Sequence, residues 1–165
     1  MNTNPIPPLP DRYLQAADAA PHGKERAAVI REAWSWIHTP WLHENRVKGR
    51  GVDCGNYPAG VFANTGLIEP PPLYKYPHDF YMHSDAELFH EIVEQFCDRV
   101  DGEPLPGDIA GFKVGRPTVG HVAIVVCWPV VLHAVRPAKE VIADDHLGPL
   151  ARAFSGLWRL KRWCE

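Results

Sequence analysis

The hydrophobic pattern of this 165-residue chain changes near Asp101-Gly102, and this change limits the folds that the chain can adopt. Before that point apolar residues recur at helical spacing, and after it they form short strand-like runs separated mostly by turn residues. Helices followed by an antiparallel meander are typical of the α+β class. We therefore expect N-terminal helices packed on an antiparallel sheet of about five strands, at residues 108–114, 121–128, 130–136, 140–143 and 157–163.

Apolar spacing and terminal signals predict the helices. The apolar positions around Ile30 and Trp34 predict a helix over 24–38 that ends at Thr39-Pro40, because the residue before proline avoids helical geometry. A shorter helix is expected over 11–20.

A second main helix is expected to begin within a residue or two after Cys54, because Pro58 fits best in a first helical turn. Gly66 is expected to cap its end. Residues 41–53 before this helix and 69–83 after it have the composition of loops.

Ser84 and Glu87 form a capping box that predicts the start of a further helix, and we expect Cys97 to lie on it among apolar residues. Cys97 and Cys127 are both interpreted as buried small hydrophobic residues, whereas Cys164 is assigned no role. The four cysteines are far apart and form no Cys-x-x-Cys pair, so a disulfide framework is not expected.

Composition excludes several classes of function. The net charge is −3 with no long basic run, so nucleic acid is not an expected partner. The longest uncharged apolar run, Val122–Leu132, is too short for a membrane span, and from the first residues no targeting signal is expected. We expect a single domain at 24–165, preceded at 1–23 by a Pro-rich arm and a possible short helix. No cofactor or metal is expected, since no histidine has convincing ligand spacing.

Cys54, His121 and His133 are the candidate catalytic residues. Cys54 lies in Gly51-Val-Asp-Cys-Gly55, at an expected helix start, where an adjacent imidazole and the helix N-terminus would favour the thiolate. A cysteine nucleophile needs a histidine base, and the base needs a third polar group to orient it. Each residue taken alone has a structural alternative, since histidines in apolar strands and single cysteines usually belong to the core.

The two histidines lie on consecutive expected strands joined by a turn at 127–130. Side chains alternate along a strand, so His121 shares a face with Ala123 and Val125. A tight turn leaves the histidines a few residues out of register, so contact between them requires strand twist or a bulge.

Five stretches together resemble the NlpC family of papain-like cell-wall cysteine peptidases, and in particular its phage tail-associated branch. They cover most of the chain between about Ala28 and Trp163. The stretches are Glu-Ala-Trp-Ser-Trp-Ile-His-Thr-Pro-Trp (32–41), Lys-Gly-Arg-Gly-Val-Asp-Cys (48–54), Leu-Pro-Gly-Asp-Ile-Ala-Gly-Phe-Lys-Val-Gly-Arg (105–116), Gly-His-Val-Ala-Ile-Val-Val (120–126) and Val-Leu-His-Ala (131–134).

The resemblance implies a papain-like fold with the cysteine on a helix packed against the sheet that carries both histidines. By position, Cys54 matches the nucleophile, His121 the base and His133 the residue that orients the base. The implied activity is hydrolysis of amide bonds in peptidoglycan stem peptides through a thioacyl-enzyme. Residues expected to bind substrate or to form the oxyanion hole are Trp41, Asp53, Gly55 and Gly120.

The phage branch further implies a protein made in the host cytoplasm and carried at the virion tail tip, where it acts on the cell wall during entry. Its expected partners are peptidoglycan and the tail-tip or baseplate hub proteins.

The chain departs from the family pattern in two places. Asp-Cys is usually followed by Ser-Gly-Leu or a close variant, whereas here Gly55-Asn56-Tyr57 and then Pro58 follow. Trp41 stands where a tyrosine is common, and it offers a ring N–H but no hydroxyl. Two alternatives therefore stay open: a structural tail-tip assembly subunit with a weakened or inactive site, and an acyltransferase or amidase with another substrate.

Overall fold

The structure, a computed structural model, describes residues 3–75, 88–115, 117–145 and 147–165. The capping box expected at Ser84 and Glu87, part of the loop expected at 69–83, and the histidines at 78, 83 and 146 lie outside these residues.

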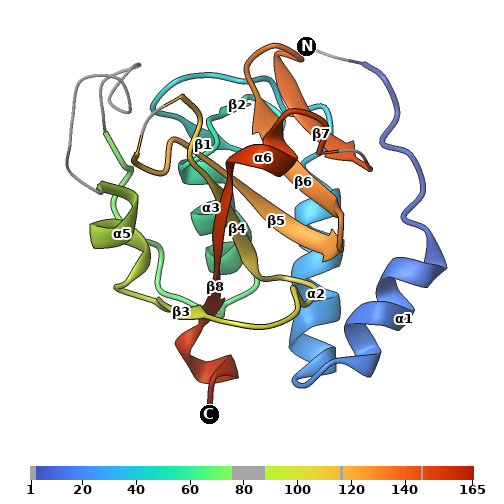
Figure 1. Cartoon of the computed structure of the whole chain (residues 1–165). Helices are drawn as coiled ribbons and strands as arrows, with labels where there is room; N and C mark the ends of the chain where they lie inside the picture. The colour runs from blue at the N-terminus through green and yellow to red at the C-terminus, as the bar shows by residue number, and fades with distance from the viewer. Residues whose placement is uncertain (1–2, 76–87, 116, 146) are drawn as a thin grey trace.

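The main sheet is 6-stranded and antiparallel, in the order β3-β8-β4-β5-β6-β7 (Figure 1). This confirms the expected α+β class. The strands are β3 Cys97–Val100, β4 Ile109–Phe112, β5 His121–Cys127, β6 Val130–Val135, β7 Glu140–Asp144 and β8 Phe154–Leu160. All five expected strands are present, although the last begins at Phe154 and gives way to a short 3-10 helix (η1) at Lys161–Trp163.

The sixth strand, β3, corrects the prediction that Cys97 lies on a helix. Cys97 begins β3 and pairs with Leu160 of β8, and its side chain is fully buried. The next two residues, Asp98 and Arg99, are exposed, so this short edge strand lacks the apolar run by which strands are recognised.

The helices are α1 Asp11–Ala19, α2 Gly23–Trp34, α3 Asn56–Asn64, α5 Leu88–Val93 and α6 Leu150–Ala153. The short helix expected over 11–20 and the helix expected after Cys54 are confirmed. Gly66, with φ 73°, follows α3, and the Gly66 and Leu67 N–H groups donate to the carbonyls of Ala63 and Phe62. This is the C-terminal cap that the glycine predicts.

α2 ends at Trp34, earlier than the expected His38. α2 ends early because the chain after it pairs with β7 at the edge of the sheet. The His38 N–H donates to the Val141 carbonyl at 3.0 Å, and the Val141 N–H donates to the Thr39 carbonyl at 2.9 Å. His38 itself adopts the left-handed conformation at φ 69°, which redirects the chain from helix to sheet.

Part of the segment 41–53, expected as a loop, forms a small hairpin instead. Its strands are β1 Arg46–Val47 and β2 Gly51–Val52, which pair antiparallel around Gly49 at φ 76°. Pairing of strands this short depends on tertiary contacts, which the sequence pattern does not reveal.

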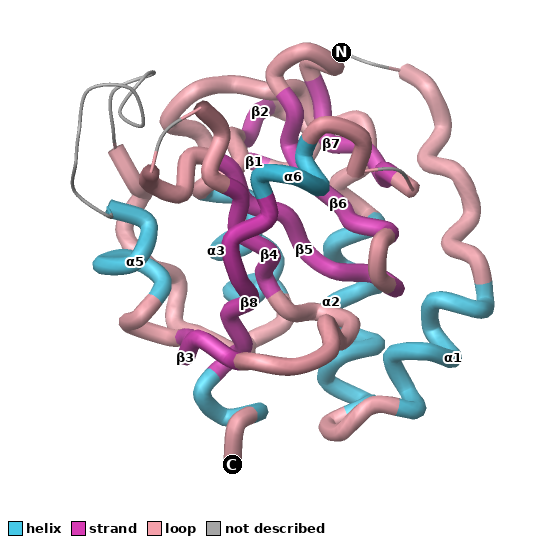
Figure 2. Tube along the Cα trace, viewed as in Figure 1, coloured by secondary structure: helices cyan, strands magenta, loops and turns pink. Residues whose placement is uncertain are grey.

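Both faces of the sheet are covered, which makes its central strands apolar on both sides. One face packs against α1, α2 and α3, and there Val122 and Ile124 of β5 join a core with Ile30 and Phe62. On the other face, where α6 lies (Figures 1 and 2), a smaller cluster includes Ala123, Val125 and Leu147. His121 belongs by alternation to this second face.

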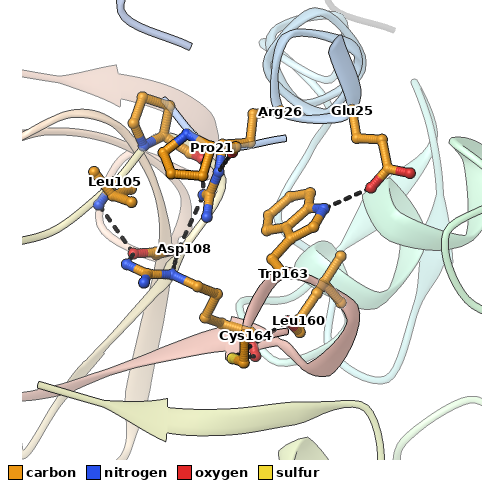
Figure 3. Close-up of polar contacts among 10 residues, drawn as sticks. Pro21, Glu25, Arg26, Leu105, Asp108, Leu160, Trp163 and Cys164 are labelled. Carbon is orange, nitrogen blue, oxygen red and sulfur yellow. Dashed lines mark hydrogen bonds and ion pairs between the residues drawn. The ribbon is translucent and has the colours of Figure 1, made fainter. Parts of the chain in front are cut away.

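A buried ion cluster ties α2 to the sheet (Figure 3). Asp108 accepts hydrogen bonds from Arg26 Nη1 at 3.2 Å and from Arg159 Nη2 at 2.7 Å, and Arg26 and Asp108 are fully buried. Asp108 also accepts from the Leu105 N–H, and the Trp163 ring lies 4.2 Å from the Arg26 guanidinium carbon. Because both guanidinium groups share the Asp108 carboxylate, the cluster can be held inside the protein.

The Pro-rich arm is extended and largely exposed, but it is anchored on the domain where the Trp34 indole N–H donates to the Pro7 carbonyl at 2.7 Å. Among the described residues, no helix combines the length and hydropathy needed to cross a bilayer.

Candidate active site

The turn that carries Cys54 is fixed by Asp53. Asp53 is fully buried, and its Oδ1 accepts from the Asn56 backbone N–H at 2.9 Å and from Asn56 Nδ2 at 3.0 Å. Its Oδ2 accepts from the Glu44 N–H at 2.7 Å. Cys54 is therefore held just ahead of α3, with Gly55 as the residue before the first helical turn.

The residues that depart from the family pattern have structural partners here. Asn56 holds the chain at Tyr74 through two hydrogen bonds, since its Oδ1 accepts from the Tyr74 N–H and its Nδ2 donates to the Tyr74 carbonyl. The buried Tyr57 hydroxyl donates to the Ala33 carbonyl at 2.8 Å and so joins α3 to α2. Pro58 lies in the first turn of α3, where its missing N–H costs no hydrogen bond.

The structure brings His121 and His133 into direct contact. Nε2 of His121 lies 2.8 Å from Nδ1 of His133, although the residues belong to different strands. The register places Ile124 opposite Leu132, and it shifts between Val125 and Cys127. This irregularity is a bulge, one of the two features, strand twist or a bulge, through which the sequence predicts that the histidines can meet.

The same bulge explains why the burial predicted for Cys127 is wrong. Cys127 was expected to be buried in the core, but its side chain is exposed. The register shift ends the regular alternation of β5 one residue before Cys127 and leaves its side chain at the surface. Cys97 is buried, as expected.

A cleft of about 570 Å³ opens beside the candidate catalytic residues. Cys54, His121 and His133 all line it, together with Trp41 and Gly120 of the residues predicted to bind substrate. Gly55 lines a smaller, mostly apolar cavity of about 50 Å³, which Cys54, Gly120 and His121 also line. Asp53 lines neither space; besides the hydrogen bonds that hold the turn, its Oδ2 lies 4.0 Å from Nδ1 of His43, which lines the cleft.

One wall of the cleft is formed by stacked side chains. The Trp41 ring stacks on His43 with centroids 6.3 Å apart, and the Arg136 guanidinium carbon lies 5.6 Å from the Trp41 ring centroid. Arg136 lies in the β6–β7 turn and is exposed, and in the described part of the chain it forms no ion pair. The cleft therefore presents a cation held against an aromatic face.

The pKa shifts of the thiol and of both imidazoles favour their uncharged forms at neutral pH. Burial, and next the charge of Asp53, raise the pKa of Cys54 to about 12, although backbone groups of Val122, Cys54 and Gly55 oppose this rise. Burial and the neighbouring His133 lower the pKa of His121 to about 3, and burial lowers the pKa of His133 to about 4. The pKa of Cys54 is thus shifted away from the thiolate that a helix start favours, because burial outweighs the backbone hydrogen bonds.

Asp144 is a cleft residue that the sequence analysis missed. It ends β7, lines the cleft, and places its Oδ2 3.4 Å from Nε2 of the buried His133. Its side chain is 25% exposed, so the carboxylate touches both solvent and the histidine pair. No motif marks this residue, and only the β6–β7 register, which pairs His133 with Ile142, brings it near His133.

Comparison with solved structures identifies the fold. Residues covering 82% of this chain match 98% of the NlpC/p60 domain of the peptidoglycan hydrolase SagA, at 18% identity and a TM-score of 0.53. The chain has the NlpC/p60 fold. NlpC2 from Trichomonas vaginalis matches 82% of this chain at 15% identity and a TM-score of 0.58, over 47% of its own length.

The peptidoglycan hydrolase RipB from Mycobacterium tuberculosis is also similar in structure. It matches 91% of this chain and 67% of its own, at 16% identity and a TM-score of 0.51. No protein-family model matches the sequence, and no curated protein matches it. At these identities the likeness establishes the NlpC/p60 fold alone.

Proposed function

We propose that this chain is a cysteine peptidase that hydrolyses amide bonds of peptidoglycan stem peptides through a Cys54-His121-His133 triad and a thioacyl-enzyme. The observation that carries the proposal is the 2.8 Å contact between His121 and His133 beside a cleft that Cys54 also lines. The choice of substrate is supported by the fold shared with SagA and RipB, both described as peptidoglycan hydrolases.

The chemistry starts from a neutral thiol and a neutral imidazole. Cys54 Sγ attacks the substrate carbonyl while His121 takes the thiol proton, and His133 holds the His121 ring in place. Backbone N–H groups beside the sulfur, at Cys54 and Gly55, would meet the developing oxyanion. His121 returns the proton to the leaving amine, and water then hydrolyses the thioester to release the acid and regenerate the thiol.

The cleft wall suits an anionic peptide. Stem peptides carry free carboxylates, and the guanidinium of Arg136 offers two parallel N–H donors to such a group. Because Trp41 lies against the guanidinium, part of the conformational freedom of Arg136 is already lost before binding. We assign Arg136 to a substrate carboxylate and Trp41 to the apolar part of the same peptide.

The biological setting is proposed from the resemblance to the phage branch. We propose that the protein is made in the host cytoplasm, is carried at the virion tail tip with hub or baseplate proteins, and acts on the wall during entry. The exposed arm over residues 3–8 offers an extended segment for docking on such a partner. A second candidate, an assembly subunit with an inactive site, is favoured by the raised pKa of Cys54, which leaves no thiolate at rest.

Zymography on purified sacculi tests the enzyme proposal, with Cys54→Ala as the control. Clearing by the natural chain and none by Cys54→Ala is expected. No clearing, together with co-sedimentation with tails, would favour the assembly subunit. Deleting residues 1–10 should preserve activity but weaken co-sedimentation, and it should lower thermal stability because it removes the Pro7 carbonyl that accepts from the Trp34 indole N–H.

A further inference from the structure

The position of Asp144 beside His133 bears on which ring nitrogen of His121 and of His133 carries the proton. A neutral imidazole carries one N–H, and Nε2 of His121 lies 2.8 Å from Nδ1 of His133, so a single proton lies between the rings. Two arrangements satisfy this hydrogen bond, and they differ in which histidine donates.

In the first arrangement His121 carries its proton on Nε2 and donates to His133. Nδ1 of His121 then has a free lone pair, which is what a base needs to accept the proton of Cys54. His133 accepts on Nδ1, so its own proton lies on Nε2 and points toward Asp144 Oδ2 at 3.4 Å.

In the second arrangement His133 donates from Nδ1 and His121 accepts on Nε2. His121 then carries its proton on Nδ1 and cannot accept another from Cys54 without becoming doubly protonated. The lone pair on Nε2 of His133 would face the Asp144 carboxylate, which is electrostatically unfavourable at 3.4 Å.

We propose that Asp144 is a positioning residue that selects the first arrangement and thereby keeps His121 competent as a base. Nε2 of His133 is buried and makes no hydrogen bond among the described residues, while Asp144 Oδ2 is an anionic acceptor within ion-pair distance. A buried donor without an acceptor is unfavourable, so movement of the partly exposed Asp144 side chain toward Nε2 is favoured. This inference rests on the proposed function for its catalytic meaning.

The direct test is the tautomer of each histidine, measured by long-range ¹H–¹⁵N correlation on protein labelled in the imidazole nitrogens. We expect both His121 and His133 to carry their proton on Nε2 in the natural chain. Asp144→Ala should shift both toward the Nδ1–H form, whereas the neighbouring Asp145→Asn should not. An Nδ1–H tautomer in the natural chain, or unchanged tautomers in Asp144→Ala, would overturn the proposal.

Kinetics give a second test that separates positioning from substrate contact. Asp144→Ala should lower kcat roughly 10-fold to 100-fold with KM unchanged, less than the loss of a whole triad member. In a His133→Asn background, which has no His133 ring to orient, Asp144→Ala should cause no further loss of kcat. An equal loss in both backgrounds would refute the positioning role.

The tautomer measurement needs no substrate, so failure of the two proposals can be told apart. A chain that cleaves no stem peptide but shows the expected tautomers keeps the Asp144 assignment and loses the proposed function. If the natural chain cleaves stem peptides but Asp144→Ala leaves the tautomers unchanged, the proposed function is kept and the Asp144 assignment is lost.

Discussion

The rings of His121 and His133 meet edge to face, with centroids 5.0 Å apart and nitrogens 2.8 Å apart. His133 is fully buried whereas His121 is only partly so, and both line the cleft. This difference in exposure supports the unequal tasks proposed for the two histidines, in which the more accessible ring exchanges a proton with substrate.

His121→Ala should therefore lose about 10²–10⁴-fold in kcat, the usual contribution of general base catalysis. His133→Asn and His133→Gln should retain part of the activity, because either amide can hydrogen-bond the His121 ring, and His133→Ala should be worse. The measurement is hydrolysis of soluble stem peptides. If His133→Asn is as inactive as His121→Ala, His133 does more than orient the base.

Cys54→Ala should abolish hydrolysis and leave the thermal unfolding midpoint nearly unchanged. A general thiol reagent will not single out Cys54, because Cys127 and Cys164 are exposed and burial raises the pKa of Cys54 to about 12. Labelling is best followed after Cys127→Ser and Cys164→Ser, with a peptide electrophile that fills the cleft. Hydrolysis by Cys54→Ala would disprove the thioacyl mechanism.

Arg136→Gln should raise KM about 10-fold and leave kcat unchanged, since it removes a charged hydrogen bond made equally in ground and transition states. Lys139→Gln is the matched control, because it removes the same charge from the same turn without lining the cleft. For a stem peptide whose carboxylates are amidated, Arg136→Gln should leave KM unchanged. Equal KM values for the two variants would contradict the carboxylate assignment.

Stability should fall as the pH is lowered from about 6.5 toward 3. The folded-state pKa values of His121 and His133 are lowered to about 3 and about 4, so the unfolded chain takes up protons first. Protonation of the coupled histidine pair should therefore lower the free energy of unfolding progressively as the pH falls through this interval. Urea unfolding at several pH values measures this, and His133→Asn should show a shallower slope. An unchanged slope would show that His133 is not buried in its neutral form.

Asp108→Ala should lower the free energy of unfolding by roughly 3–5 kcal/mol, because it leaves the fully buried Arg26 unpaired. Asp98→Ala, an exposed carboxylate on β3, is the control and should change the free energy by about 0.5 kcal/mol or less. The midpoint of urea unfolding checks both variants. A small effect of Asp108→Ala would mean that water reaches Arg26.

Periodicity was sufficient to predict the main strands and the helix after Cys54, because each has an apolar face that must be buried. It failed where neighbours decide the structure. β3 forms because it can pair with the edge of β8. α2 ends early because residues 38–41 pair with β7. Cys54, His121 and His133 could be proposed from their order and residue types, but the spatial neighbour Asp144 follows from strand register alone.

The bulge between Val125 and Cys127 decides on which side of the sheet His133 points. With the pairing of Cys127 and Val130 continued without the bulge, His133 would lie opposite Ile124 and point toward the helices, away from His121. The extra residue places it opposite Ala123 instead, on the same side as His121. The interval of twelve residues between the histidines, together with the bulge, therefore decides whether both lie on the same side of the sheet. An insertion or deletion of one residue before the turn would preserve the sheet and separate the pair.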